Sequence, residues 1–356
     1  MKITSFDIRL ENLQLTRPYT IAYKTVSAVE NCVVELQLEN GMRGIGTANP
    51  SKLVVGEDVH DCMQALKKEE IRSAIVGKDI RELRALCEQL HLLLVGHAGA
   101  LAALDIALHD LWGQYLGLPL VRLLGQRIKA LPTSITIGIK NVEETLQEAE
   151  EYAGRGFRIL KVKLGHSLEE DIERLVKLRE MLGQRMDIRV DANQAYSQEE
   201  VIEFYHKTRK LDIELIEQPM PREALNDMKD LPAEIRQHIA ADESLIDALD
   251  AFNLARQEAC GIFNIKLMKC GGIHQALRIA EVARAAVVFL MWGCNDESIV
   301  SITAALHAAF ACPHTRFIDL DGSLDLARDV AQGGFVLKDG LMFVSDAPGL
   351  GLRPRT

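Results

Sequence analysis

The sequence predicts an α/β protein in two parts, an α+β module followed by a closed parallel barrel. The chain has 356 residues, which is enough for roughly two domains of about 150 residues each. Its pattern changes near residue 125. Beyond that point, short apolar runs rich in β-branched residues alternate with amphipathic helical runs, as in βαβ units of a parallel sheet. Eight such runs favour a closed barrel.

The first part begins with strands and continues with helices. Residues 6–15 ("FDIRLENLQL") and 31–48 ("NCVVELQLENGMRGIGTA") have the pattern of antiparallel strands, with a turn at "ENG". Helical patterns extend from about Val59 to Tyr115. The glycines and proline of "LGLPLVRLLG" then end this part.

The second part holds the eight strand candidates, which are "PTSITIGI", "ILKVKLG", "DIRVDAN", "IELIEQP", "HIAADES", "GIFNIKLMK", "VVFLMWGC" and "RFIDLDG". Helical runs such as 167–182 and 273–286 lie between them. An open doubly wound sheet is the alternative. It would usually carry a glycine-rich phosphate-binding sequence after its first strand, and this chain has none there.

Composition restricts the partners and the location. The formal net charge of -10 argues against nucleic acid and anionic membranes, since both bind basic patches. The N-terminal "MKITSFDIRLE" lacks the apolar core of a secretory signal, and the apolar stretch 91–118 is interrupted by charged residues. The seven cysteines are odd in number and form no CxxC pair. We therefore expect reduced thiols and a cytoplasmic protein.

Charged residues recur at the ends of five successive strand candidates, at intervals of 28, 26, 25 and 24 residues: Lys163, Asp191, Glu217, Asp242 and Lys266. Each interval accommodates one βα unit. Because barrel active sites lie at the C-terminal ends of the strands, these side chains are expected to converge. Lys161 and Lys163 share one face of their strand, since side chains at i and i+2 point the same way. We expect both lysines to face the three carboxylates.

The carboxylates of Asp191, Glu217 and Asp242 predict a metal site. Converging carboxylates disfavour one another's ionisation, and a hard divalent cation relieves this. Oxygen ligands suit Mg²⁺, or else Mn²⁺ or Ca²⁺, and we expect one ion per subunit. The alternative is three unrelated acids that cap the helices after them, and the regular spacing disfavours it.

Lys163 and Lys266 lie one strand before and one strand after these ligands. They would approach a metal-bound substrate from opposite sides. Burial, the neighbouring ammonium of Lys161 and the metal would all lower the pKa of such a lysine. One lysine would then remove the proton α to a carboxylate, the metal would stabilise the enediolate, and the other lysine would return a proton to the opposite face. A Schiff-base lysine at Lys266 would not need three carboxylates, and a metal-binding scaffold protein would not need the lysines.

The motifs "KVK", "DAN", "EQP", "ADES", "KLMKCGG" and "GCNDES", in this order, resemble the muconate-lactonising branch of the enolase superfamily. The resemblance extends over nearly the whole chain, including "LTRPYTIAY" and "AALDIALHDL". It implies a modified (β/α)7β TIM-type barrel over residues 126–324. It also implies an α+β capping domain over residues 1–125, completed by a C-terminal segment of about 325–356.

The resemblance also implies roles for individual residues. It implies Mg²⁺ on the three carboxylates and Lys163 and Lys266 as the acid/base pair. Lys161 would help to hold the substrate carboxylate. Supporting roles would belong to Asn193, Lys269 and Glu297.

Asp319 and Asp321, in "FIDLDGSLDL", bear on the substrate. A D-x-D before glycine is often a solvated turn. Within this branch, however, the pair on the last strand candidate resembles the dipeptide epimerases, such as L-Ala-D/L-Glu epimerases, where it holds the substrate ammonium. A muconate-type cycloisomerase (an intramolecular lyase) and an o-succinylbenzoate synthase are the alternative activities. Neither has a substrate ammonium.

Three charged residues are candidates for binding a substrate side chain. Asp296 would bind a basic one, whereas Lys24 or Lys52 would bind an acidic one. We favour Asp296, because a strand end is rigid and the two lysines lie on loops that can turn outward. We therefore expect a cytoplasmic, Mg²⁺-dependent epimerase that inverts the C-terminal α-carbon of L,X-dipeptides, prefers cationic dipeptides and acts as a homo-oligomer.

Overall fold

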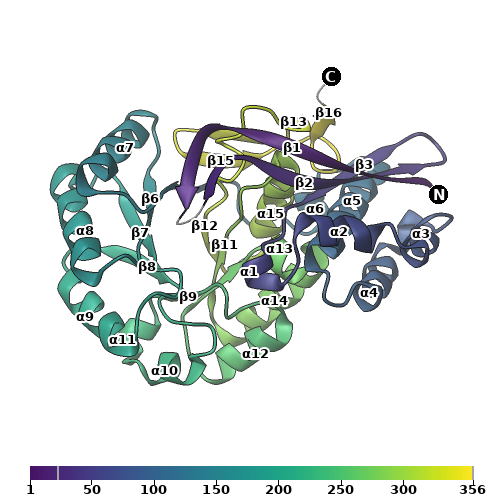
Figure 1. The fold of residues 1–356 in the computed structure, drawn as a ribbon. Coiled ribbons are helices and arrows are strands. Elements are labelled where there is room, and N and C mark those ends of the chain that lie inside the picture. Colours follow the sequence, from purple (N-terminus) through teal and green to yellow (C-terminus); the bar gives the residue numbers. More distant parts are fainter. Residues whose placement is uncertain (22–23, 355–356) are drawn as a thin grey trace.

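A nearly closed barrel of eight parallel strands and a separate N-terminal capping domain make up the protein (Figure 1). The computed structural model describes residues 1–21 and 24–354, with the side chains of residues 18–26 and 354 left out of the description. The architecture confirms the predicted fold class. No helix in this described part of the chain is long and apolar enough to cross a membrane.

The barrel strands neighbour one another in chain order: β5 (Ser134–Ile137), β6 (Ile159–Lys163), β7 (Asp187–Asp191), β8 (Ile213–Glu217), β9 (Ile239–Ala241), β10 (Ile262–Ile265), β11 (Phe289–Trp292) and β12 (Thr315–Ile318). An isolated parallel bridge between Thr133 and Ile318 joins β12 to β5. A buried cluster of Leu215, Ala240, Ile262, Met291 and Phe317 lies on β8 to β12. Leu215 precedes the predicted site residue Glu217 by two residues, and Phe317 precedes Asp319 by two. Each therefore points to the same side as that site residue and lies next to it toward the barrel interior.

Seven helical connections link these strands: α7 (Val142–Gly154), α8 (Leu168–Leu182), α9 (Gln198–Thr208), α10 (Leu225–Asp230) with α11 (Ala233–Arg236), α12 (Ala248–Arg256), α14 (Ile273–Ala286) after the short α13 (Leu267–Cys270), and α15 (Ile299–Ala311). Several begin at side-chain caps. Ser197 and Glu200 form a reciprocal capping box at the start of α9. Helices α7 to α12 form the outer rim around the strands (Figure 1).

The capping domain begins with an antiparallel sheet of β1 (Ile3–Ile21), β2 (Lys24–Leu38) and β3 (Arg43–Ala48). Its helices are α1 (Lys52–Val55), α2 (Val59–Leu66), α3 (Glu69–Ile75), the 3-10 turn η1 (Ile80–Glu82), α4 (Leu83–Leu93), α5 (Ala98–Leu116) and α6 (Leu120–Leu123). Helix α5 is apolar on nearly every side and almost wholly buried. It therefore forms the core of the capping domain, against which the sheet packs.

The C-terminal segment runs back to the capping domain. Its strands are β13 (Ala331–Gly333), β14 (Phe335–Lys338), β15 (Leu341–Val344) and β16 (Leu352–Pro354), and β15 also pairs with β4 (Leu131–Pro132). Thr16 N donates to Asp325 O at 2.7 Å, and Ala327 N donates to Gln14 O at 2.8 Å. Figure 1 shows these yellow strands beside β1. The domain boundaries near residues 125 and 325 stay predictions.

Candidate active site

Lys161, in the middle of β6, is buried among carboxylates. Its Nζ lies 2.8 Å from Asp319 Oδ2, 2.8 Å from Glu217 Oε2 and 3.2 Å from Asp191 Oδ2. Burial alone would lower the pKa of Lys161, but Asp319, Glu217 and Asp191 outweigh it and hold that pKa well above the usual value. Lys161 is therefore a fixed positive charge at the centre of the site.

The register of the sheet brings the three predicted metal ligands together. Asp191 pairs directly with Glu217 across β7 and β8. Glu217 pairs with Ala240 across β8 and β9, and Asp242 follows Ala240 by two residues on the same face. All three carboxylates are buried. The predicted convergence therefore follows from aligned strand ends.

Asp191 faces the predicted base Lys163. Lys163 Nζ donates to Asp191 Oδ2 at 2.6 Å and to Asn193 Oδ1 at 3.1 Å. Burial of Asp191 opposes its ionisation, but the ammonium groups of Lys163 and Lys161 outweigh burial and lower its pKa. Asn193 thus holds the ammonium that we predicted to act on the substrate.

Asp242 contacts two lysines that follow β10, Lys266 directly after the strand and Lys269 in α13. Lys266 Nζ lies 2.7 Å from Asp242 Oδ2. Lys269, which is buried, donates to the other carboxylate oxygen of Asp242 and, at 3.1 Å, to Asn264 O. Burial would lower the pKa of Lys266, but Asp242 and Glu217 raise it. A lysine that acts as a base needs a lowered pKa. Lys266 therefore requires another cation to engage Asp242 and Glu217, so that these carboxylates no longer raise its pKa.

Glu217 shows most clearly that a cation belongs here. Its Oε1 accepts a hydrogen bond from Asn264 Nδ2 at 2.9 Å. Its Oε2 is buried and accepts no hydrogen bond of suitable geometry, although the Lys161 ammonium is near. Burial and the neighbouring Asp191 raise the pKa of Glu217 to about 8. Sequence reasoning missed Asn264, although its place two residues before Lys266 on β10 signals the same inward face.

The donor set fits Mg²⁺. It consists of buried carboxylate oxygens on adjacent strand ends, which suit a hard cation. In the described chain, only Cys87, Asp105 and His109 bring three potential ligand atoms within 4.8 Å of one another. The three barrel carboxylates are spread more widely because lysine ammonium groups lie between them.

Asp319 and Asp321 lie just past the end of β12 rather than on the strand itself. Asp319 Oδ1 accepts from Ser134 Oγ at 2.6 Å, and Asp321 Oδ2 accepts from Thr136 N at 2.8 Å. Both carboxylates therefore bond to β5. They do so where β12 and β5 are joined by one isolated bridge. Burial and the nearby Asp319 raise the pKa of Asp321 to about 7.

The segment after β11 carries Asp296 and Glu297. Asn295 N donates to Glu297 Oε1 at 2.7 Å, and burial raises the pKa of Glu297 to about 7. Asp296 is half-buried, and its backbone oxygen accepts from Asn49 Nδ2 at 2.7 Å. Asp296 thus lies where the capping domain meets the barrel.

Of the two lysines considered as alternatives to Asp296, the side-chain contacts of Lys52 are described and those of Lys24 are not. Lys52 Nζ lies 2.8 Å from Asp58 Oδ2 and 3.2 Å from Asp61 Oδ2, so it contacts its own loop and α2. Lys24 begins β2, and its side chain lies outside the described residues. The partners of Lys52 weaken its case as a substrate-binding residue.

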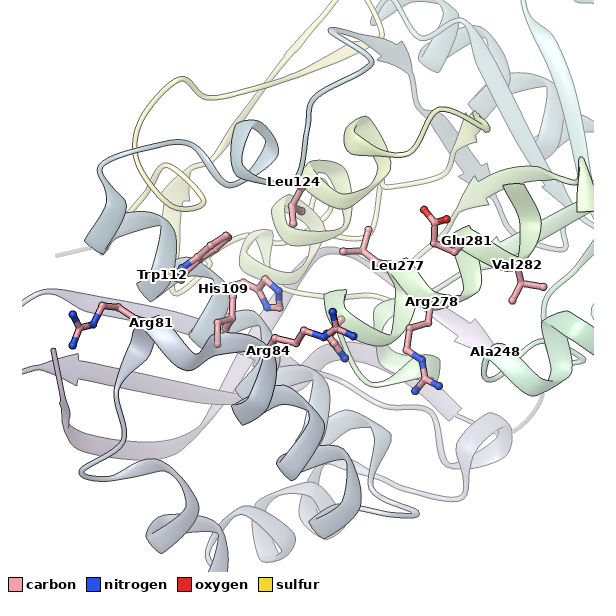
Figure 2. Close-up of a pocket in the computed structure, with 12 residues that line it drawn as sticks. Arg81, Arg84, His109, Trp112, Leu124, Ala248, Leu277, Arg278, Glu281 and Val282 are labelled. Atoms are coloured by element: carbon pink, nitrogen blue, oxygen red, sulfur yellow. The ribbon is translucent and has the colours of Figure 1, made fainter. Parts of the chain in front are cut away.

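A cavity of about 700 Å³ lies away from these residues, between α4 and α5 of the capping domain and α12 and α14 of the barrel (Figure 2). Trp112, Leu124 and Leu277 give it apolar walls, and Arg84 and Arg278 also line it. His109, which forms a cluster with Cys87 and Asp105, also lines the cavity. None of the predicted site residues lines this cavity.

Two family models together match most of the chain. A model described as "Mandelate racemase / muconate lactonizing enzyme, N-terminal domain" matches residues 3–125. A model described as "Enolase C-terminal domain-like" matches residues 144–356.

Curated relatives match over nearly their full length. An L-Lys-D/L-Arg epimerase of Methylococcus capsulatus is 52% identical over 99% of both chains. An L-Lys-D/L-Arg epimerase of Desulforapulum autotrophicum is 53% identical over 99% of both chains. An L-Ala-D/L-Glu epimerase of Clostridium acetobutylicum is 36% identical over 96% of both chains.

Solved structures agree with these matches. A dipeptide epimerase from Methylococcus capsulatus, complexed with Mg and the dipeptide L-Arg-D-Lys, superposes with a TM-score of 0.96 at 52% identity and covers 99% of both chains. A dipeptide epimerase from Enterococcus faecalis V583, complexed with Mg and L-Leu-L-Tyr, superposes with a TM-score of 0.92 at 34% identity and covers 99% of both chains.

Proposed function

The chain belongs to the mandelate racemase / muconate lactonizing enzyme group of the enolase superfamily, and from this premise we propose that it is a Mg²⁺-dependent dipeptide epimerase. The observation that carries the proposal is the buried set of three carboxylates between two flanking lysines. Relatives with this activity, similar over nearly their whole length, support it.

The reaction is a 1,1-proton transfer at the α-carbon of the C-terminal residue. For one epimer Lys163 takes the α-proton, and Lys266 delivers a proton to the opposite face. For the other epimer the two lysines exchange roles. One turnover in this direction leaves Lys163 with one proton more and Lys266 with one proton fewer, and proton exchange with solvent restores both lysines before the next; no other reactant is needed.

Asp191, Glu217 and Asp242 would hold one Mg²⁺, or else Mn²⁺. When bound, the ion supplies positive charge beside the substrate carboxylate, which favours loss of the α-proton. Lys161 adds a second fixed positive charge, which three carboxylates hold in place. Lys269 and Asn264 orient Asp242 and Glu217 through hydrogen bonds.

Asp319 and Asp321 are proposed to bind the ammonium of the dipeptide's N-terminal residue. Asp296 is proposed to bind a basic side chain, so that cationic dipeptides are preferred. The relatives named as L-Lys-D/L-Arg epimerases and the engagement of Lys52 by Asp58 and Asp61 support this preference.

A dipeptide screen in D₂O tests the activity. Purified protein with MgCl₂ is incubated with dipeptide mixtures, and mass spectrometry measures deuterium at the α-carbon. Lys- and Arg-containing dipeptides should be labelled fastest, and N-acetylated forms should react slowly. Equal turnover of N-acetylated and free dipeptides would contradict the role of Asp319 and Asp321. Faster turnover of Ala-Glu than of Ala-Lys would contradict the role of Asp296.

Two variants test the specificity residues separately. A charge-assisted hydrogen bond contributes about 1.5–3 kcal/mol, so Asp321→Ala should lower kcat/KM by roughly ten- to a hundredfold or more. Asp296→Leu should shift the preference from cationic toward apolar dipeptides while activity is retained. An unchanged order of substrates in Asp296→Leu would exclude Asp296 as the side-chain-binding residue.

A further inference from the structure

The cavity of about 700 Å³ in Figure 2, called the interdomain cavity here, lies between helices of both parts of the chain. Residues of α4 and α5 line it on one side, and residues of α12 and α14 line it on the other. Ligand pockets commonly measure about 300–1,000 Å³ and often form between domains. The size and the place of the interdomain cavity therefore suit a small molecule.

Positive charge dominates the lining of this cavity. Arg81, Arg84 and Arg278 line it, and among the described residues that do so Glu281 is the only carboxylate. Glu281 is itself neutralised, because Arg284 Nη2 lies 2.8 Å from its Oε2. The chain as a whole has a net charge of -10, so this group of arginines departs from the average charge of the protein. The cavity therefore favours an anion.

Two of the arginines have donors to spare. Arg278 donates to the neutral Gln275 Oε1 at 3.0 Å, and no carboxylate in the described part of the chain forms a salt bridge with it. Arg84 donates through Nε to Glu88 Oε1 at 2.9 Å, which leaves its two Nη groups without a described partner. A guanidinium group carries five N–H donors and can bind a carboxylate through two of them. Arg84 and Arg278 are therefore available to an anionic ligand.

His109 adds a donor on the buried side of the cavity. Its side chain is 5% exposed, and its Nδ1 lies 2.8 Å from Asp105 O. A carbonyl oxygen only accepts, so the hydrogen is on Nδ1. His109 Nε2 has no hydrogen-bond partner among the described residues, although His109 lines the cavity. Burial would lower the pKa of His109, but the Asp105 carboxylate outweighs burial and raises it, which favours an N–H at Nε2 as well.

A buried donor without a partner is unusual, and each one calls for an acceptor. An anion in the interdomain cavity would provide that acceptor for His109 Nε2. The same anion would meet the arginines that line the cavity.

The ligand must also have an apolar part. Trp112, Leu124 and Leu277, called the apolar wall here, are all half-buried and line the cavity (Figure 2). A ring or a branched hydrocarbon that covers the apolar wall removes this surface from water, which is favourable. A fully polar anion such as inorganic phosphate would not gain this contribution. The lining therefore matches a molecule with one anionic end and one apolar end.

We propose that the interdomain cavity is a second ligand site, which binds a small organic anion with an apolar ring or branched chain and a carboxylate head. The carboxylate binds Arg278, Arg84 and the Nε2 of His109, and the hydrocarbon covers the apolar wall. This proposal goes beyond the epimerase activity and does not depend on it, because none of the predicted active-site residues lines the cavity.

A fluorescence titration with anilinonaphthalene sulfonate tests the site. The sulfonate of this probe stands in for the carboxylate, and its aromatic rings stand in for the apolar part. The wild type, with MgCl₂ present, should bind the probe saturably. N-phenylnaphthylamine has the same rings without the sulfonate and should bind at least about tenfold more weakly, because the charge-assisted hydrogen bonds are lost. Equal affinity for both probes, or no saturable binding of the sulfonate, would overturn the proposal.

Two variants locate the probe. Arg278→Gln changes an exposed side chain and should weaken binding of the sulfonate about tenfold or more. Ala248→Phe adds a ring to the lining of the cavity and should block binding. Arg185→Gln is the matched control and should bind like the wild type, because Arg185 is a surface arginine that pairs with Glu150 and does not line the cavity. Wild-type affinity in Arg278→Gln would overturn the proposal.

Competition tests the preference for a carboxylate. Phenylbutyrate should displace the fluorescent sulfonate from the wild type. The neutral phenylbutyramide, which has the same hydrocarbon, should require a concentration about tenfold higher or more, since it lacks the charge that the arginines bind. Equal displacement by the acid and the amide would overturn the carboxylate head.

Discussion

Each lysine that faces the barrel carboxylates contacts at least one of them. Lys161 contacts three carboxylates, Lys163 contacts Asp191, and Lys266 contacts Asp242. A buried charge without a partner is costly, so the removal of one group changes the ionisation of the others. Single substitutions in this set should therefore have large and distinct effects.

Glu217→Gln should weaken Mg²⁺ binding. The amide keeps the shape of Glu217 but loses the negative charge that suits a hard cation. We expect a loss of affinity of at least about a hundredfold in titration calorimetry with MgCl₂, whereas Asn264→Ala, which removes only a partner of Glu217, should cost about ten- to a hundredfold. Unchanged Mg²⁺ affinity in Glu217→Gln would rule out Glu217 as a ligand.

Lys163→Ala and Lys266→Ala should each abolish epimerisation. Each variant should still exchange the α-proton of one epimer for deuterium, because the remaining lysine can remove and return a proton on its own face. Proton NMR of separate L,L- and L,D-dipeptides in D₂O measures this. Exchange of both epimers by one variant would show that a single base is sufficient.

Asp321 should couple substrate binding to pH. Its raised pKa of about 7 means that the carboxyl is largely protonated in the free protein below that pH. A bound ammonium favours the ionised form, so binding near pH 6 should release about one proton and strengthen as the pH rises through 7. Calorimetry in two buffers of different ionisation enthalpy measures the release. Asp321→Asn should release none, and equal heats for the wild type in both buffers would refute this coupling.

Individual elements are joined by side chains that cap helix ends. Asp105 of α5 is an example: its Oδ1 accepts from Ile273 N at 2.6 Å and from His274 N at 3.3 Å, at the start of α14. The same carboxylate lies 3.2 Å from His109 Nδ1. One buried carboxylate thus links a helix of the capping domain to a helix of the barrel.

Asp105→Ala should therefore destabilise the fold more than removal of an ordinary cap. Asp247 is the comparison, because it caps the helix that directly follows it in the chain. It accepts from Leu249 N and Asp250 N at the start of α12. We expect a loss of about 1 kcal/mol for Asp247→Ala and of about 2 kcal/mol or more for Asp105→Ala, which also leaves buried His109 without its anion. Urea unfolding measures both. Equal losses would indicate that the link between domains adds nothing.

The two domains also meet at His307 of α15. Its Nδ1 accepts from Val121 N of α6 at 2.9 Å, and burial lowers its pKa to about 3. The unfolded chain, with an ordinary histidine pKa, binds a proton at a higher pH than the folded chain does. Stability contributed by neutral His307 is therefore present above about pH 6.5 and is lost as the pH falls toward 3.

His307→Asn should reduce this loss, since asparagine offers Val121 N an acceptor that does not titrate. Between about pH 8 and about pH 5, the wild type should lose roughly 2 kcal/mol more of its free energy of unfolding than the variant does. Urea unfolding at both pH values measures the difference. Parallel losses in the two proteins would exclude His307 as the titrating group.

The sequence by itself determined the barrel, the α+β module before it and the order of charged residues at the strand ends. These features depend on local periods, since strand side chains alternate every two residues and one βα unit separates successive strands. The alignment of Asp191 with Glu217 follows from that regularity. The residue roles remain predictions for the experiments above.

Only the tertiary structure decided which distant groups meet. Arg222 contacts Val54 across 168 positions, and Asn49 contacts Asp296 across 247 positions. Asp319 bonds to Ser134 because the barrel closes there, and Lys52 turns to Asp58 and Asp61 rather than to the site. No local period relates such residues. Their contacts depend on how the domains pack and how the barrel closes, which are properties of the whole chain.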